Sequence, residues 1–110
     1  MNISIEDAGQ VKVLGFEGEL DAGTAPEAQG EIDRLRAGGS SKIVIDFDRL
    51  SYISSAGLRV LMLTAKHLKD AGGELRVCGL NKTVGEVFDM SGFSTILNVF
   101  GDREEALADF

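Results

Sequence analysis

Residues 42–62, KIVIDFDRLSYISSAGLRVLM, join a strand-like segment to a helix-like one and decide the fold. Positions 42–47 include three consecutive β-branched residues, which is typical of a strand covered on both faces. From 55 to 70 one helical face is apolar, made of Leu58, Leu61, Met62, Ala65 and Leu68. The stretch therefore predicts a central strand followed by an amphipathic helix, with Ser54 and Ser55 at the junction.

The rest of the chain alternates between strand and helix patterns. Apolar periodicity and turn residues predict the other elements: strands at 2–6, 11–17, 74–79 and 95–100, and helices at 24–39, 82–92 and 102–110. The first two strands flank the turn Ala8-Gly9-Gln10 and so form a hairpin. Thr24 and Glu27 fit a capping box at the start of the first helix. We therefore expect an α/β fold, a single domain over residues 1–110 with a mixed, mostly parallel sheet of about five strands, an N-terminal hairpin and about four helices.

Composition places the chain among ordinary globular domains. Its 110 residues are 44% hydrophobic and 26% charged, with one proline, which favours one compact unit over a disordered chain. No apolar run approaches the ~20 residues of a membrane span, and the start MNISIEDAGQ lacks the pattern of a secretory signal. We expect a cytoplasmic protein with no membrane partner.

Charge and metal-ligating residues exclude further classes of protein. The formal net charge is −7 and no basic cluster occurs, so nucleic acid is not expected as a partner. Cys78 and His67 are each the only residue of their type, so they cannot build a thiolate or imidazole metal cluster. Cys78 fits a small buried hydrophobe, and His67 fits a solvated helix face. We expect no metal and no cofactor.

The residues present argue against three kinds of site: a serine hydrolase site, a nucleotide-binding loop and a receiver-domain phosphorylation site. A serine hydrolase needs a base beside its nucleophile, but His67 follows Ser55 on the same predicted helix at a distance of ~18 Å. The segment AGGSSK lacks the frame of a nucleotide-binding loop. A receiver domain would use Asp46 together with an acidic pair at the end of the first strand, where this chain turns into a hairpin instead. The protein is not expected to be an enzyme.

The helix start at Ser54 and Ser55 has two interpretations. Serine is a preferred helix cap, worth ~1 kcal/mol over alanine. The same place, at the carboxyl edge of a parallel sheet, also offers free N–H groups and the positive end of the helix dipole to a phosphate. Spacing alone leaves both interpretations open, the cap being the commoner role.

Three segments together resemble a known family. GELDAGTAPEAQGEI, KIVIDFDRLSYISSAGLRVLM and GGELRVCGLNKTVGEVFDMSGF are similar to the STAS domain, the sulphate-transporter and anti-sigma-factor-antagonist family, and specifically to its stand-alone anti-sigma factor antagonists. The most specific part is the strand with Asp46, then Tyr52-Ile53, two small residues and Gly57-Leu58, preceded by the Gly-Glu-Leu-Asp turn. The similarity spans nearly the whole chain.

This resemblance implies a protein that switches partners. In the family the serine two places before the glycine, here Ser55, is phosphorylated by an anti-sigma factor that is itself a serine kinase of histidine-kinase-like ATPase fold. The unphosphorylated form would bind this kinase and free its sigma factor, and a metal-dependent serine phosphatase would restore binding after phosphorylation. Ser54 replaces the family's usual aspartate and Ala56 its usual serine or threonine, which leaves Ser54 as the less favoured site of modification.

The resemblance also suggests which residues would contact a partner. Asp21 and Thr24 match the family's contact turn, although turn and cap roles explain them equally well. Asp46 and Asp48 would lie near Ser55, either to orient its hydroxyl or to close the loop from strand to helix. The full expected set is Asp21, Thr24, Asp46, Asp48, Ser54, Ala56, Gly57 and Arg59. We expect a monomer when free, because no strongly apolar stripe is left exposed.

A second functional class fits the same domain. The chain would then be a STAS module without a switch, either a scaffold subunit of a larger assembly or an accessory of a lipid or anion transporter. Neighbouring genes for transporter components, rather than for a kinase-like ATPase and a phosphatase, would favour that class.

Overall fold

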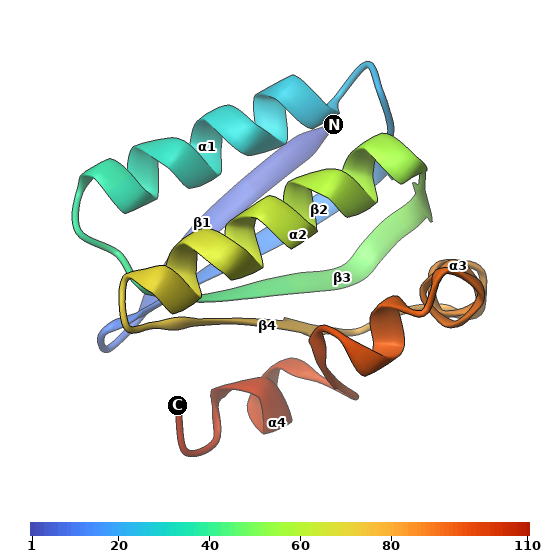
Figure 1. The fold of residues 1–110 in the computed structure, drawn as a ribbon. Helices are drawn as coiled ribbons and strands as arrows, with labels where there is room; N and C mark the ends of the chain where they lie inside the picture. Colours follow the sequence, from blue (N-terminus) through green and yellow to red (C-terminus); the bar gives the residue numbers. More distant parts are fainter.

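The strands lie in the sheet in the order in which they occur in the chain, β1-β2-β3-β4-β5. The computed structural model describes residues 1–110, and its elements are β1 (Asn2–Ala8), β2 (Val11–Leu20), α1 (Ala25–Ala37), β3 (Lys42–Ile53), α2 (Ser55–Asp70), β4 (Glu74–Cys78), α3 (Lys82–Ser91), the 3₁₀ turn η1 (Phe93–Thr95), β5 (Asn98–Phe100) and α4 (Arg103–Leu107) (Figure 1). β1 pairs antiparallel with β2, and every later pair is parallel. The predicted mixed, mostly parallel sheet with an N-terminal hairpin is confirmed.

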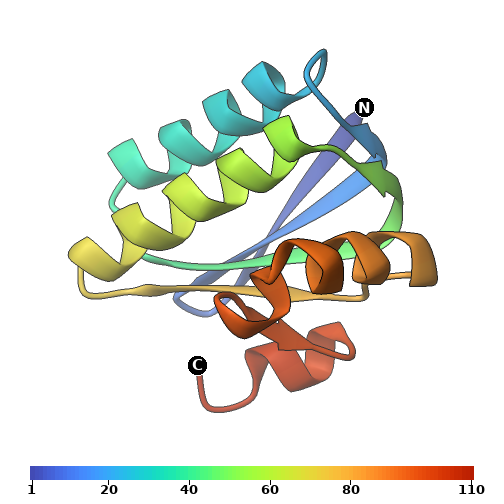
Figure 2. The ribbon, with the colours of Figure 1, turned by 45° about the vertical axis from the view of Figure 1, so that its right-hand side comes forward.

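The two faces of the sheet are covered unequally. α1 and α2 lie side by side over one face, while α4 lies across the other (Figure 2). Alternation along β3 assigns its side chains to the two faces. Ile45 and Phe47 belong to the core beneath α1 and α2, whereas Val44 belongs to a small cluster beneath α4. β3 is therefore the central, doubly covered strand that its sequence predicts.

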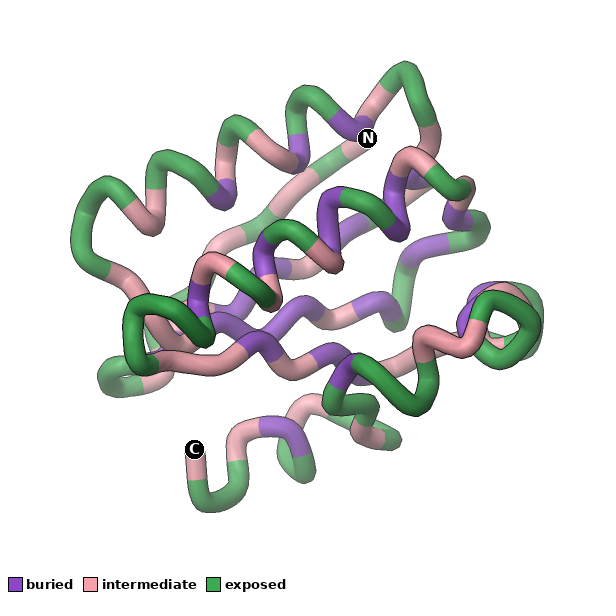
Figure 3. Tube along the Cα trace, in the orientation of Figure 1, coloured by how far each residue is buried: buried purple, intermediate pink, exposed green.

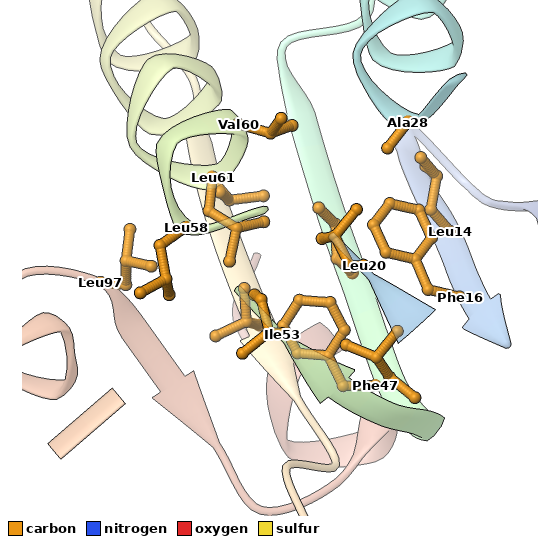
Figure 4. Close-up of a cluster of buried hydrophobic side chains, with 14 of the residues drawn as sticks. Leu14, Phe16, Leu20, Ala28, Phe47, Ile53, Leu58, Val60, Leu61 and Leu97 are labelled. Atoms are coloured by element: carbon orange, nitrogen blue, oxygen red, sulfur yellow. The ribbon is translucent and has the colours of Figure 1, made fainter. Parts of the chain in front are cut away.

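The core lies mainly on the α1 and α2 side. One cluster of 20 buried residues fills this side, and a second cluster of five lies under α4. Buried positions follow the inner sides of α1 and α2 and the middle of the sheet (Figure 3). In the close-up, Leu58 and Leu61 of α2 lie on the inner side of the helix, with Leu58 beside Leu97 and Leu61 above Ile53 at the end of β3 (Figure 4). The end of the sheet at which α2 begins is thus firmly packed.

The predicted apolar faces are found where the sequence pattern places them. Leu58, Leu61 and Leu68 of α2 are buried, and Met62 and Ala65 are partly buried against them. In α3 the predicted inward residues behave likewise: Val84 and Phe88 are buried and Val87 is partly buried.

None of the helices is both long and apolar enough to cross a bilayer.

Several element boundaries differ from prediction, among them the ends of β1 and β2, which lie at Ala8 and Leu20 and not at 6 and 17. β3 runs six residues past the predicted end at Phe47, and its pairing with β2 shifts register between Gly15 and Glu17 and again between Gly18 and Glu19. These irregularities let a polar tract continue as strand. The last strand is shorter than 95–100 because the chain first makes the turn η1, in which Phe93 packs edge-on against Phe88. The terminal helix covers only Arg103–Leu107 of the predicted 102–110.

Candidate docking surface at the start of α2

The two adjacent serines have different environments. Ser54 is the N-cap of α2 with an extended backbone, and its Oγ accepts a long hydrogen bond of 3.5 Å from the Gly57 amide. Its own amide donates to the Leu20 carbonyl at 2.9 Å, which ties the helix start to the end of β2. Ser55 is the first residue of the helix, is exposed, and makes no side-chain hydrogen bond within the chain. The cap is therefore Ser54, and the free hydroxyl belongs to Ser55.

Gly57 allows α2 to begin this close to the sheet. A Cβ at this position would lie 2.8 Å from Ile53 Cγ1, 2.8 Å from Leu20 Cγ and 2.9 Å from the Leu20 carbonyl oxygen. Such separations are well inside van der Waals contact, and the backbone oxygen has no rotamer with which to move away. Glycine thus fixes the height of Ser55 above the ends of β2 and β3.

Asp21 and Thr24 form a closed turn between β2 and α1. The Asp21 carboxylate accepts from the amides of Gly23 at 2.9 Å and Thr24 at 3.2 Å. The Thr24 hydroxyl accepts from the Asp21 amide at 2.9 Å and donates to the Glu19 carbonyl at 2.8 Å. The predicted capping box is wrong, because Thr24 uses its hydroxyl to close this turn and makes no side-chain bond to the helix amides. Both residues hold the loop beside the start of α1.

A groove between α1 and α2 opens beside Ser55. It has a volume of about 380 Å³ and is mostly apolar in character. From α2 it is lined by Ser55, Ala56, Arg59, Val60 and Leu63; from the α1 side it is lined by Ala22, Ala25, Pro26 and Gln29. Leu63 remains 43% exposed although it is a large apolar side chain. The arrangement offers a hydroxyl at the rim of a small apolar groove, which suits contact with another protein.

Ser55, Arg59 and Leu63 form a stripe that sequence reasoning did not recognise as a unit. The three residues are spaced four apart on α2, so they lie along one line of the helix. This line runs beside the predicted apolar face, not within it. A leucine outside the core face is the feature that could have revealed the groove, together with Pro26 and Gln29 on the facing helix.

Asp46 and Asp48 do not lie beside Ser55, and the expectation that they would is wrong. Asp46 extends from the α4 face of the sheet, where one of its oxygens accepts from the Asp48 amide at 3.0 Å and the other pairs with Arg103 at 3.1 Å. Arg103 also pairs with Glu6 at 2.7 Å. These residues line a separate polar hollow of about 530 Å³. Strand alternation places Asp46 opposite the core side chains, and β3 continues well beyond it before α2 begins.

Cys78 beneath this polar hollow and Glu17 at its rim have shifted pKa values. Burial, followed by the nearby negative charge of Asp46, raises the pKa of the Cys78 thiol to about 12. Cys78 is completely buried, which confirms it as a small buried hydrophobe and leaves it protonated at neutral pH. A hydrogen bond from Asn2, and next one from Arg49, lowers the pKa of the exposed Glu17.

His67 takes no part in either hollow. It lies near the end of α2, partly buried, with Nδ1 enclosed and without a hydrogen-bond partner. The chain contains no group of three or more His, Cys, Asp and Glu side chains placed to hold a metal ion. The chemistry available at the start of α2 is therefore that of one exposed hydroxyl and one guanidinium.

Comparison with known proteins gives the same family as the sequence motifs. The sequence profile of the STAS domain matches residues 2–106. BtrV of Bordetella bronchiseptica is 37% identical over 110 residues, and the match covers 100% of this chain and 95% of BtrV. Its name describes it as a proposed anti-sigma factor antagonist. The anti-sigma-B factor antagonist of Staphylococcus aureus is 31% identical over 101 residues, covering 90% of this chain and 94% of that protein.

Solved structures share the fold at lower identity. The crystal structure of an anti-sigma factor antagonist from Mycobacterium paratuberculosis superposes with a TM-score of 0.88 at 24% identity, covering 96% of this chain and 90% of that one. The phosphorylated form of SpoIIAA, a Bacillus cell fate determinant, superposes with a TM-score of 0.74 at 23% identity, covering 96% of each chain. The strand order, the hairpin and the match over nearly the whole length lead to one conclusion: this chain belongs to the STAS domain family.

Proposed function

We propose that this protein is an anti-sigma factor antagonist that acts by binding, not by catalysis. Its unphosphorylated form binds an anti-sigma factor through the surface at the start of α2, and the sigma factor is thereby released. Phosphorylation of Ser55 switches this binding off. The observation that carries the proposal is the Ser55 hydroxyl, which is exposed, unbonded within the chain and placed at the rim of the groove between α1 and α2.

The names of relatives support the same function. BtrV and the Staphylococcus aureus protein are both named as anti-sigma factor antagonists, and both match this chain over nearly their full length. SpoIIAA, which shares the fold, has been solved in unphosphorylated and phosphorylated forms. These relatives support a regulator whose partner is an anti-sigma factor.

The partner in this proposal is a serine kinase of histidine-kinase-like ATPase fold. It transfers the terminal phosphoryl group of ATP to Ser55: the bond from Oγ to phosphorus forms, the bond from phosphorus to the ADP oxygen breaks, and the hydroxyl proton passes to a base of the kinase. A metal-dependent serine phosphatase reverses the modification by hydrolysis. Ser55 is favoured over Ser54 because Ser54 is half-buried and its side-chain oxygen serves as the helix cap.

The proposed contact surface is smaller than the set expected from sequence. It contains the turn of Asp21 and Thr24, the segment 54–57 and Arg59, all at the end of the sheet where α1 and α2 begin. Within it Gly57 is buried and acts by setting the position of α2. Asp46 and Asp48 lie on the other face of the sheet and are not included.

A charge effect explains why phosphorylation would release the partner. A phosphate adds about −1.5 to −2 charge and must be desolvated if the surface is to stay covered. Each ~1.4 kcal/mol of lost binding energy lowers affinity tenfold, so an uncompensated phosphate in the contact would cost at least that.

The test combines phosphorylation with binding. The protein is incubated with its cognate anti-sigma factor and ATP, and the phosphate is located by mass spectrometry; label on Ser55 is expected. Ser55→Asp should lose binding at least tenfold and Ser55→Ala should keep it, with Ser94→Ala, at an exposed serine outside the contact surface, as the matched control. Equal binding by the Asp and Ala variants would refute the charge mechanism and favour a STAS module that does not switch, such as a scaffold or transporter subunit.

A further inference from the structure

Arg59 is the exception among the arginines of this protein. The other arginines each form an ion pair: Arg34 with Glu31, Arg36 with Asp33, Arg49 with Glu17, Arg76 with Glu74, and Arg103 with Glu6 and Asp46. Arg59 is exposed and makes no ion pair or side-chain hydrogen bond within the chain. An unpaired guanidinium is unexpected on a chain with a net charge of −7, because carboxylates outnumber cations in the chain as a whole.

Arg59 faces the same space as Ser55. The two residues are four apart on α2, which places them on one side of the helix with an axial offset of about 6 Å. Both line the groove between α1 and α2. The residues that α1 and the preceding loop contribute to this groove, including Pro26 and Gln29, carry no charge, so Arg59 is the only charged or titratable side chain in its lining. No carboxylate in the groove competes for the guanidinium.

We propose that Arg59 is an internal counter-ion for phosphorylated Ser55. On phosphorylation, the phosphate oxygens accept hydrogen bonds from the Arg59 guanidinium within the same helix. The order is the favourable one, with the anion N-terminal to the cation at a spacing of four. A guanidinium also matches phosphate geometry with two parallel hydrogen bonds. This inference rests on the modification of Ser55 in the proposed function.

An ion pair between Arg59 and phosphorylated Ser55 would also change the charge that the groove presents to a partner. Without phosphate, the groove carries one positive charge that is available to a carboxylate of the partner. With phosphate, the net charge of the groove becomes negative at neutral pH, and the guanidinium that a partner could use is already occupied. Phosphorylation then removes an attractive group in the same step that adds a repulsive one. Such a switch needs no movement of the backbone.

The experiment measures the phosphate directly. Phosphoserine is installed at position 55 during translation or by chemical ligation, so that no kinase is needed, and the second ionisation of the phosphate is followed by ³¹P NMR. A free phosphoserine titrates near pH 6, and a nearby cation lowers this pKa. Arg59→Gln should raise the phosphate pKa by about half a unit relative to the unsubstituted protein, the shift expected of an exposed ion pair.

A matched control distinguishes an ion pair between Arg59 and the phosphate from the general electrostatic effect of positive charges on α2. Lys66→Gln removes the same charge from an exposed position of α2, but 11 residues beyond Ser55 and outside the groove, and should leave the phosphate pKa unchanged. Arg59→Lys keeps the charge without the planar fork and should restore only part of the shift. The effect of Arg59 should shrink in about 0.5 M salt, because screening weakens exposed pairs. Circular dichroism checks that each variant is folded.

Two outcomes would overturn the inference. One is a phosphate pKa that does not change in Arg59→Gln, and the other is an equal change in Lys66→Gln. Either result leaves the proposed function standing, since phosphate at Ser55 could still repel a partner without an internal counter-ion. Failure of the proposed function would instead appear as equal partner binding by Ser55→Asp and Ser55→Ala, which the NMR titration does not address.

Discussion

Two hollows of this molecule, one on each face of the sheet, differ in how their charged side chains are paired. The larger, on the α4 face, is lined by Glu6, Glu17, Asp46, Asp48, Arg49 and Arg103, and both arginines are paired there with carboxylates. The smaller, between α1 and α2, is mostly apolar and contains one cation without a partner. The proposed docking surface thus lies at the smaller of these two hollows. In the larger hollow both arginines are paired with carboxylates, whereas the smaller one leaves a hydroxyl, a guanidinium and apolar surface exposed.

The largest effect is expected from Gly57, beneath the smaller hollow. Gly57→Ala should lower the free energy of unfolding by about 2 kcal/mol, because the new methyl group meets Leu20 and Ile53 at 2.8 Å and the overpacking outweighs the gain in helix propensity. Urea denaturation measures the change. Gly30→Ala is the control, since Gly30 lies within α1 and a methyl group added there would meet nothing within 4 Å, and this variant should gain up to about 1 kcal/mol. Equal effects of the two variants would show that the close approach of α2 is not constrained.

Replacing the paired Arg103 and, separately, the unpaired Arg59 tests whether their ion pairing makes them differ in their contribution to stability. Arg103→Met should destabilise the protein by about 1.5 kcal/mol, because it leaves the Asp46 carboxylate, whose side chain is only 15% exposed, without its ion-pair partner. Arg59→Met removes the same charge from the groove and should change stability by less than about 0.5 kcal/mol. Both values come from the same denaturation experiment. A destabilisation by Arg59→Met as large as that of Arg103→Met would mean that Arg59 has a structural role.

Alkaline pH tests the thiol beneath the larger hollow. The pKa of Cys78 is about 12 in the folded protein, raised from 9.0, so the folded state holds its proton more tightly than the unfolded state. The stabilisation is therefore complete below pH 9 and is lost as the pH rises from 9 toward 12. Between about pH 8 and 10 the protein should lose about 1 kcal/mol more stability than Cys78→Ala, which has no thiol to ionise. Parallel losses in the two proteins would contradict a protonated buried thiol.

The smallest effect is expected at the rim of the larger hollow. Asn2 donates a hydrogen bond of 3.1 Å to the Glu17 carboxylate and is the main cause of its lowered pKa. Asn2→Ala should move the pKa of Glu17 upward toward its ordinary value, as measured by NMR titration of the side-chain carboxyl carbon. Arg49→Gln should also move it upward, since Arg49 lowers this pKa both by a hydrogen bond and by its charge. An unchanged pKa of Glu17 in Asn2→Ala would contradict the role of the Asn2 hydrogen bond.

The fold could be predicted because its strong patterns are local. The doubly covered strand 42–47, the apolar stripe of α2 and the glycine stops are visible in short windows of sequence, and the family motifs place them along one chain. The exceptions depend on tertiary contacts. The 3₁₀ turn at Phe93–Thr95 exists because Phe93 packs on Phe88, and the continuation of β3 to Ile53 depends on shifted pairing with β2.

The candidate site was predictable in part. The position of two serines at a helix start follows from the change of period, but spacing cannot decide which hydroxyl forms the cap. The prediction for Asp46 fails because nearness to Ser55 along the chain does not mean nearness in space, and alternation with Ile45 and Phe47 already indicates the opposite face. The unpaired state of Arg59 could not be predicted at all, since it depends on where every carboxylate lies.

The agreement between strand order and chain order has a consequence for synthesis. Each strand finds its neighbour among residues that the ribosome has already made, so pairing can proceed as the chain emerges, without waiting for a distant segment. The residues that line the groove at Ser55 fall between Ala22 and Leu63. The proposed docking surface is therefore translated before α3 and α4, which come later in the chain and both pack against β3.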